Sequence, residues 1–120
     1  MNIGKTGKNG EDMVAAFLRK QGLAVVKRNY QCRFGEIDII AETKEYIIFV
    51  EVKTRKKDSM VKGIDAVDSR KQQRIMLTAE DYISKTLCEK QPRFDVAEVI
   101  IEKTEESRTK YSLNYIKNAF

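Results

Sequence analysis

Two short apolar runs of the sequence carry charged side chains at positions where charge is normally excluded. The first run, residues 35–40, contains Asp38, and the second, residues 47–53, contains Glu51 and Lys53. Both runs have the composition of strands that are buried on both faces. Because side chains alternate along a strand, Glu51 and Lys53 are expected on the same face.

The expected hairpin register places Asp38 opposite Glu51. If the turn centres between Lys44 and Glu45, the numbers of paired residues sum to 89 and the two carboxylates face each other. Opposed residues have Cβ atoms only ~5 Å apart, and like charges facing each other destabilise a sheet. A divalent cation would offset that repulsion, so we predict a metal site. The alternative is a purely structural role, because edge strands often carry charges that discourage aggregation.

The available residue types restrict the chemistry of such a site. The chain has no histidine and only two cysteines, Cys32 and Cys88, which lie far apart in the sequence. A structural zinc site, a Cys–His pair and a Ser–His–Asp triad are therefore excluded. Oxygen ligands suit Mg²⁺ or Mn²⁺, and we expect the two cysteines to be packed thiols, not a disulfide.

Length and charge indicate a single domain that acts on a polyanion. The 120 residues are expected to form one domain, 1–120. No apolar run approaches the ~20 residues that would cross a bilayer, and the N-terminus has no export signal, so a cytoplasmic location without membrane contact is expected. The net charge is +5, and the first 60 residues hold 12 basic and 8 acidic side chains. A cationic surround for an acidic site suits a metal-dependent reaction on a polyanion.

Apolar periodicity and turn residues predict the secondary structure. Asn9 is the expected N-cap of the first helix and Gly22 its terminator, and Asp68 or Ser69 is the expected cap of the second. The order α-β-β-β-α-β-β predicts an α/β fold with a mixed sheet flanked by helices. The expected elements are a helix at 8–21, strands at 24–31, 36–41 and 46–54, a basic loop at 55–63, a helix ending near Thr86 with Ile75, Leu77, Tyr82 and Ile83 buried, and strands at 93–101 and 110–116.

The combination of these motifs resembles the PD-(D/E)XK nuclease superfamily. Within it, the chain resembles the small bacterial YraN-like family, whose fold is similar to archaeal Holliday-junction resolvases and to the tRNA-endonuclease-like domain. The resemblance covers about Gly4 to Phe120 and implies a three-layer, restriction-endonuclease-like fold. The superfamily's Pro-Asp dipeptide is absent, since Ile37 precedes Asp38, as in the resolvase-like branch. The motifs that carry it are Gly10-Glu11, Arg28-Asn29, Gly35-Glu36-Ile37-Asp38, Phe49-Val50-Glu51-Val52-Lys53-Thr54-Arg55, Lys71-Gln72, Arg93-Phe94-Asp95-Val96 and Asn118-Ala119-Phe120.

The resemblance also implies roles for individual residues. Asp38 and Glu51 would be metal ligands together with the Val52 carbonyl. Lys53 would position or activate the attacking water and stabilise the charge that develops on the phosphate; its structural alternative is an ion pair with Glu51 or Asp38. Glu11 corresponds to a first-helix carboxylate that contacts the metal directly or through water.

Glu11 and one further polar residue also have structural alternatives. Gln72 corresponds to an auxiliary polar position on the second helix, and its alternative role is a solvated helix face. For Glu11 the alternative is to complement the helix dipole.

Basic residues after the Glu-X-Lys motif are expected to contact phosphates. No aromatic residues are interleaved among them, which favours binding of a nucleic-acid backbone with little sequence preference. A charge run can equally be a solvated surface. The residues are Arg55, Lys56, Lys57, Lys62, Arg70, Lys71 and Arg74.

Three functions follow from these observations and the resemblance. The first is a Mg²⁺- or Mn²⁺-dependent endonuclease that acts on DNA rather than RNA, on structured or branched forms. The second is a nucleic-acid-binding module on the same scaffold without catalysis, and the third is an interaction protein with a structural acidic pocket. By resemblance to resolvases, which make two symmetric cuts, a homodimer is also expected.

Overall fold

The computed structural model follows the element order expected from the sequence. It describes the backbone of residues 3–58 and 67–120 and the side chains of residues 9–58 and 67–120, so Lys62 lies outside the described residues. The order α-β-β-β-α-β-β and the α/β fold class are confirmed. The elements are α1 (Ile3–Lys20), β1 (Ala24–Cys32), β2 (Gly35–Glu42), β3 (Tyr46–Lys56), α2 (Ser69–Thr86), β4 (Gln91–Lys103) and β5 (Thr109–Ile116).

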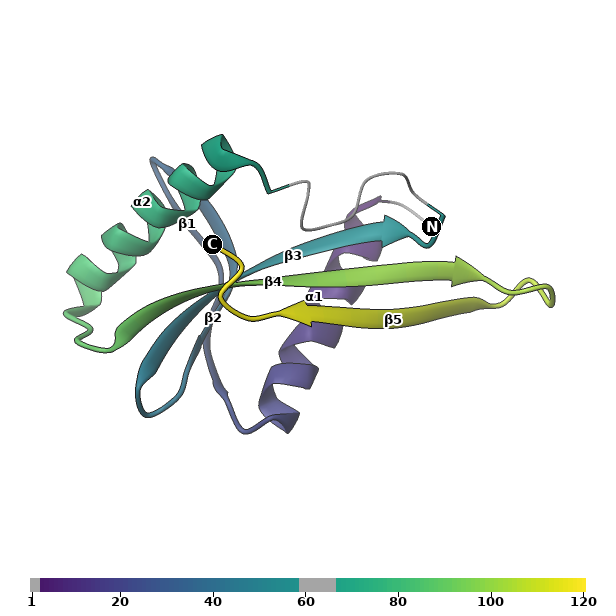
Figure 1. The fold of residues 1–120 in the computed structure, drawn as a ribbon, viewed down its shortest axis with the longest axis horizontal. Coiled ribbons are helices and arrows are strands. Elements are labelled where there is room, and N and C mark those ends of the chain that lie inside the picture. The colour runs from purple at the N-terminus through teal and green to yellow at the C-terminus, as the bar shows by residue number, and fades with distance from the viewer. Residues whose placement is uncertain (1–2, 59–66) are drawn as a thin grey trace.

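The five strands form one mixed sheet between two helices. Their spatial order is β1-β2-β3-β4-β5, with β3 and β4 parallel and all other neighbours antiparallel. Ile48 and Val50 pack in the apolar cluster beneath α1, whereas Ile47 and Phe49 pack in the cluster beneath α2. Since successive strand residues point to opposite faces, the two helices lie on opposite sides of the sheet (Figure 1). A continuous apolar run in β3 therefore supplies both cores.

Helix α1 packs an apolar stripe onto the sheet but begins earlier than expected. Val14 and Leu18 are buried, and Gly22 ends the helical segment with φ of +91°. The expected start at residue 8 and the N-cap at Asn9 are wrong, because the helix begins at Ile3. A Cβ atom on Gly10 would lie 3.0 Å from the Thr54 Oγ1 atom, so this glycine permits the close approach of α1 to β3.

Helix α2 begins at its expected cap and presents a slightly different face to the sheet. The Asp68 carboxylate accepts a hydrogen bond of 2.9 Å from the Lys71 backbone N–H, which confirms Asp68 as the N-cap. Ile75, Thr78 and Ala79 are the buried positions of the helix. Leu77 was expected in the core but is 42 % exposed, because it is two residues from Ile75 and points away from that stripe.

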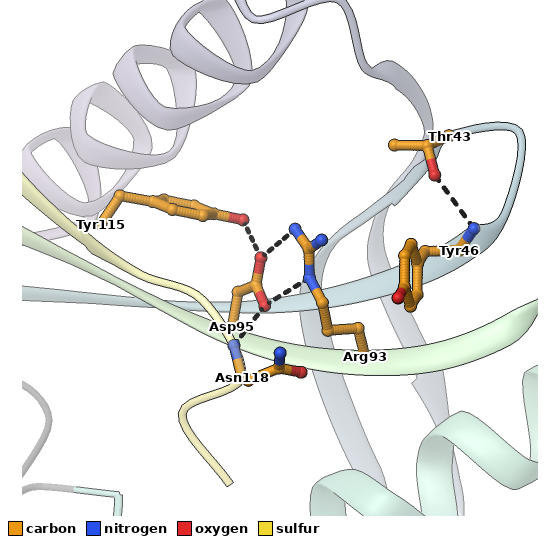
Figure 2. A network of polar contacts seen from close by, with 6 residues as sticks. All are labelled: Thr43, Tyr46, Arg93, Asp95, Tyr115 and Asn118. Carbon is orange, nitrogen blue, oxygen red and sulfur yellow. Dashed lines mark hydrogen bonds and ion pairs between the residues drawn. The ribbon is translucent and has the colours of Figure 1, made fainter.

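A buried carboxylate holds the last residues of the chain against the sheet (Figure 2). Asp95 on β4 is fully buried and accepts hydrogen bonds of 2.8 and 3.0 Å from the Arg93 guanidinium. It also accepts from the Tyr115 hydroxyl at 2.6 Å and from the Asn118 backbone N–H at 3.1 Å. The Phe120 ring then stacks on that of Phe94 at a centroid distance of 5.2 Å. The terminal residues therefore extend the core on the α2 side.

Two further expectations concern the cysteines and the membrane. Cys32 and Cys88 are both unpaired, as expected from the sequence. Within residues 3–58 and 67–120, neither helix is long and apolar enough to cross a bilayer.

Candidate active site

The β2–β3 hairpin has the register expected from the sequence. The pairs run from Glu42–Ile47 to Ile39–Val50. Asp38 and Glu51 occupy the next positions of the same register. Both strands continue past this point, yet no further β2–β3 pair forms in the part of the chain that the structure describes. The two strands therefore separate where the acidic residues lie.

The Asp38 carboxylate replaces the missing main-chain partner of β3. Its Oδ2 atom accepts a hydrogen bond of 2.8 Å from the Val52 backbone N–H. The N–H and C=O of a strand residue point toward the same neighbouring strand. The Val52 carbonyl therefore faces the β2 side as well, beside Asp38.

Burial and charge repulsion make Asp38 a much weaker acid than an ordinary aspartate. Burial raises the pKa of its carboxyl group to about 7, and the nearby negative charges of Glu51 and Glu11 add to the shift. The Val52 hydrogen bond opposes it. Glu51 itself is only 8 % exposed. The structure thus holds two carboxylates close together in a poorly solvated place.

Two ammonium groups converge on the Glu51 carboxylate. The Lys53 Nζ atom lies 3.4 Å from Glu51 Oε1, and the Lys71 Nζ atom lies 3.6 Å from the same oxygen. Lys53 comes from β3, whereas Lys71 comes from the first turn of α2. Burial and the neighbouring Lys53 lower the pKa of Lys71. Burial also acts against the charge on Lys53, but the Glu51 and Asp38 carboxylates favour that charge, and the pKa of Lys53 is raised.

Glu11 approaches the same region from α1. Burial raises the pKa of its carboxyl group, the Arg28 guanidinium opposes that shift, and Glu36 adds to it. An Arg28 nitrogen lies 3.7 Å from Glu11 Oε1 and 2.7 Å from an oxygen of Asp12. Glu11 therefore belongs to the neighbourhood of Asp38, held partly by an arginine.

Asn29 links the carboxylates of α1 and β2. With the amide nitrogen turned toward them, Asn29 Nδ2 lies 3.1 Å from Glu11 Oε1 and 3.3 Å from Glu36 Oε1. Its φ of +54° is unusual within a strand but is tolerated by asparagine. The register of β1 on β2 places Asn29 opposite Asp38. Asn29, Asp38 and Glu51 therefore form a row across three strands.

Asp38, Glu51 and Lys71 border a cleft with one acidic and one basic side. Its volume is about 460 Å³. The acidic side comes from β2 and β3, and the basic side comes from the first turns of α2. The lining residues are Gly35, Glu36, Asp38, Glu51, Asp68, Arg70, Lys71, Arg74 and Ile75.

Three other candidate residues, Gln72, Arg55 and Lys57, form hydrogen bonds or ion pairs outside the cleft. The Gln72 side-chain amide donates to the Val67 carbonyl at 3.0 Å. Arg55 forms a 2.8 Å ion pair with the buried Glu98, and Lys57 forms a 3.1 Å pair with Glu102.

The expected loop start at residue 55 is also corrected. The strand β3 extends to Lys56, so Arg55 and Lys56 lie in a strand, not in the expected loop. Lys56 itself is exposed.

Sequence reasoning missed two features of the site. It assigned Lys71 to phosphate contacts along a surface, and it gave no role to Asn29. The position of Lys71 depends on how α2 docks on the sheet, which local patterns do not specify. Asn29 did carry a signal, because asparagine is one of the few non-glycine residues that adopt the left-handed conformation.

The donor set for a cation is small. Among the described residues, no group of three or more His, Cys, Asp or Glu side chains is arranged to hold a metal ion. Asp38, Glu51 and the Val52 carbonyl would therefore have to suffice, with water as the remaining ligands. Mg²⁺ commonly binds through one or two carboxylates and retains several waters, so these residues fit it.

Comparison with known proteins identifies close relatives of the chain. The model of the family described as "Uncharacterised protein family UPF0102" matches residues 10–99. A UPF0102 protein of Clostridium acetobutylicum is 44 % identical over 117 residues, which cover 97 % of this chain and 93 % of the relative. A UPF0102 protein of Caldanaerobacter subterraneus is 41 % identical over 121 residues, which cover 100 % and 98 %. One from Dictyoglomus turgidum is 41 % identical over 121 residues and is covered completely, as is this chain.

Proposed function

The chain belongs to the uncharacterised protein family UPF0102, and from this premise we propose that it is a metal-dependent nuclease of the PD-(D/E)XK superfamily. Its substrate would be DNA rather than RNA, in a structured or branched form, and its reaction the hydrolysis of a phosphodiester bond. The observation that carries the proposal is the pair Asp38 and Glu51, which meet where β2 and β3 separate, beside Lys53.

The residues of the site would have different roles in this reaction. Asp38, Glu51 and the Val52 carbonyl would hold Mg²⁺ or Mn²⁺. When bound, the cation supplies positive charge to the scissile phosphate and acidifies the attacking water. Lys53 positions that water and stabilises the negative charge that develops on the phosphate.

Substrate binding is best supported for the basic side of the cleft. Arg70 and Arg74 line the cleft from α2 and make no ion pair among the residues that the structure describes. Arg55 and Lys57 already have carboxylate partners. We therefore assign the phosphate contacts of the cut strand to α2, and they carry no base readout.

A second function is favoured by one observation. Lys53 and Lys71 both contact Glu51, so the negative charge of the carboxylate pair is already balanced in part before any cation binds. A nucleic-acid-binding module without catalysis would need only this balance and the basic side of the cleft.

Cleavage assays distinguish the two functions. Purified protein is incubated with duplex, single-stranded, flapped and four-way-junction DNA and the matching RNAs, in Mg²⁺, Mn²⁺ or EDTA. The nuclease predicts cleavage of a structured DNA that EDTA stops and that Asp38→Asn and Glu51→Gln abolish while DNA binding survives. Glu106→Gln is the control, because Glu106 is an exposed residue of the β4–β5 connection. Salt-sensitive binding without cleavage of any substrate would support the binding module instead.

A further inference from the structure

Lys71 lies beside Glu51, a position that a general contact with the nucleic-acid backbone does not require. We propose that Lys71 is a second lysine of the reaction centre, which contacts the phosphate that is cut. This inference rests on the proposed nuclease function and deepens it, because it assigns a residue of α2 to the reacting group.

The geometry separates Lys71 from the other cations of α2. Its ammonium group lies 3.6 Å from Glu51 Oε1, the same oxygen that Lys53 approaches to 3.4 Å. Arg70 and Arg74 line the same cleft, yet neither forms an ion pair with a carboxylate in the described parts of the chain. Among the described cations that line the cleft, Lys71 alone therefore reaches a predicted metal ligand, Glu51.

The local structure holds Lys71 in this place. Its backbone N–H donates to the Asp68 carboxylate at 2.9 Å, so the first turn of α2 is capped at this residue. Its side chain is 37 % exposed and extends into the cleft toward a carboxylate that is 9 % exposed. Lys71 is therefore accessible to a ligand in the cleft while it stays beside Glu51.

The charges of the site explain how a second lysine would assist the reaction. The two ammonium groups at least offset the charge of Asp38 and Glu51, so a bound divalent cation would leave the centre positive. A phosphodiester carries one negative charge, and a second develops in the transition state of its hydrolysis. Two ammonium groups near the phosphate therefore favour the transition state over the ground state, which accelerates the reaction.

Replacement of Lys71 by glutamine tests the proposal. Lys71→Gln keeps most of the side-chain length and removes the charge, and Lys85→Gln is the matched control near the opposite end of α2, where Lys85 pairs with Asp81 at 3.0 Å. Three quantities are measured: the single-turnover rate at saturating Mn²⁺ on the DNA that the wild type cuts, the Kd for that DNA in EDTA, and the Mn²⁺ affinity by calorimetry.

The three quantities should respond differently. We expect Lys71→Gln to slow cleavage by about 100-fold, the usual effect of losing one transition-state contact. The Kd for DNA should rise by less than about 5-fold, since most phosphate contacts remain. The Mn²⁺ affinity should stay equal or increase, because a repelling ammonium group is gone. Lys85→Gln should match the wild type in all three.

Several results would overturn the proposal. Cleavage by Lys71→Gln within about twofold of the wild type would leave Lys71 no part in the reaction. If Lys71→Gln weakened only DNA binding, Lys71 would be a contact to the DNA backbone away from the cut phosphate. If Lys71→Gln weakened Mn²⁺ binding, Lys71 would serve to position Glu51. If circular dichroism shows that Lys71→Gln is unfolded, Lys71→Arg, which keeps the charge, must be folded and cut faster than Lys71→Ala. A wild type that cuts nothing removes the nuclease function as well, whereas an active wild type with an unaffected variant removes only this inference.

Discussion

At the scale of single residues, the account depends on Asp38 and Glu51. Alternation along two strands and the length of the connecting turn were enough to predict their register, and the ladder of β2 and β3 has that register. The sequence did not reveal that the ladder ends just before this pair, because both strands continue past it. It is this separation that lets the Asp38 side chain reach the Val52 N–H.

The raised pKa of Asp38 predicts a pH-dependent stability. The pKa of this group is about 7 in the folded protein, against 3.8 for an unperturbed aspartate. Between these pH values the folded protein binds more protons than the unfolded chain, so the free energy of unfolding falls as pH rises. The contribution of protonated Asp38 to the free energy of unfolding is complete below about pH 4 and is lost by about pH 7. Asp38→Asn cannot ionise and should not show this loss.

Urea unfolding of metal-free protein at several pH values measures the effect. Circular dichroism is the suitable probe, because the chain has no tryptophan. Between about pH 4 and pH 8, the wild type should lose on the order of 2–4 kcal/mol relative to Asp38→Asn. Parallel curves for the two proteins would show that Asp38 ionises normally.

Lys71 and Asn29 show what residue patterns could not predict. Lys71 lies among several basic residues of similar spacing, and only the docking of α2 brings its ammonium group to Glu51. Asn29 owes its place to a left-handed φ within β1, which no periodicity indicates. The position of Lys71 is thus a tertiary effect without a local signal, whereas Asn29 carried only the weak signal of a residue type that tolerates the left-handed conformation.

At the scale of elements, the first two turns of α2 form the basic side of the cleft. Its N-cap was predictable, because an aspartate directly before a helical segment is a common cap. The start of α1 was not, because glycines near its N-terminus disfavour a helix by up to ~1 kcal/mol each. Contact with β3 at Gly10 makes such a glycine useful. Local capping therefore marked the start of α2, whereas no local signal marked the start of α1.

The cap at Asp68 predicts coupled effects on stability and on Lys71. Asp68→Ala should lower the free energy of unfolding by about 1 kcal/mol, the usual value of an N-cap. Asp68→Asn keeps the accepting oxygen and should lose little. If the cap also holds Lys71 beside Glu51, Asp68→Ala should slow cleavage more than Asp68→Asn does.

Urea unfolding and single-turnover cleavage of both variants provide the measurement. Ser69→Ala is the control, because Ser69 is exposed and does not cap the helix. Equal stability of Asp68→Ala and Asp68→Asn would mean that the hydrogen bond to the Lys71 N–H contributes nothing.

At the scale of the whole molecule, the sheet and the terminal residues hold both cores together. The mixed sheet was predictable from element order, but the Asp95 network was not, because its partners come from β4, β5 and the residues beyond (Figure 2). Asp95 and Phe94 belong to the motif Arg93-Phe94-Asp95-Val96, for which the resemblance implied no role. In the structure they fix the end of the chain against the face that α2 covers.

Removal of the Asp95 carboxylate should therefore destabilise the whole fold. Asp95→Ala leaves the Arg93 guanidinium, whose side chain is 12 % exposed, without its carboxylate, at an expected cost of about 3–5 kcal/mol. Glu106→Ala removes an exposed surface pair with Arg108 and should cost less than about 1 kcal/mol. Urea unfolding compares the two, and a cost for Asp95→Ala no larger than for Glu106→Ala would contradict the structural role of the network.

The most direct test of the central claim is calorimetric titration of Mn²⁺ into the wild type, Asp38→Asn, Glu51→Gln and Glu106→Gln. The account predicts one Mn²⁺ bound by the wild type and by Glu106→Gln. Each of the other two variants should bind it at least about 10-fold more weakly, because each loses a carboxylate of a two-carboxylate site. Undiminished Mn²⁺ binding by both Asp38→Asn and Glu51→Gln would contradict the account.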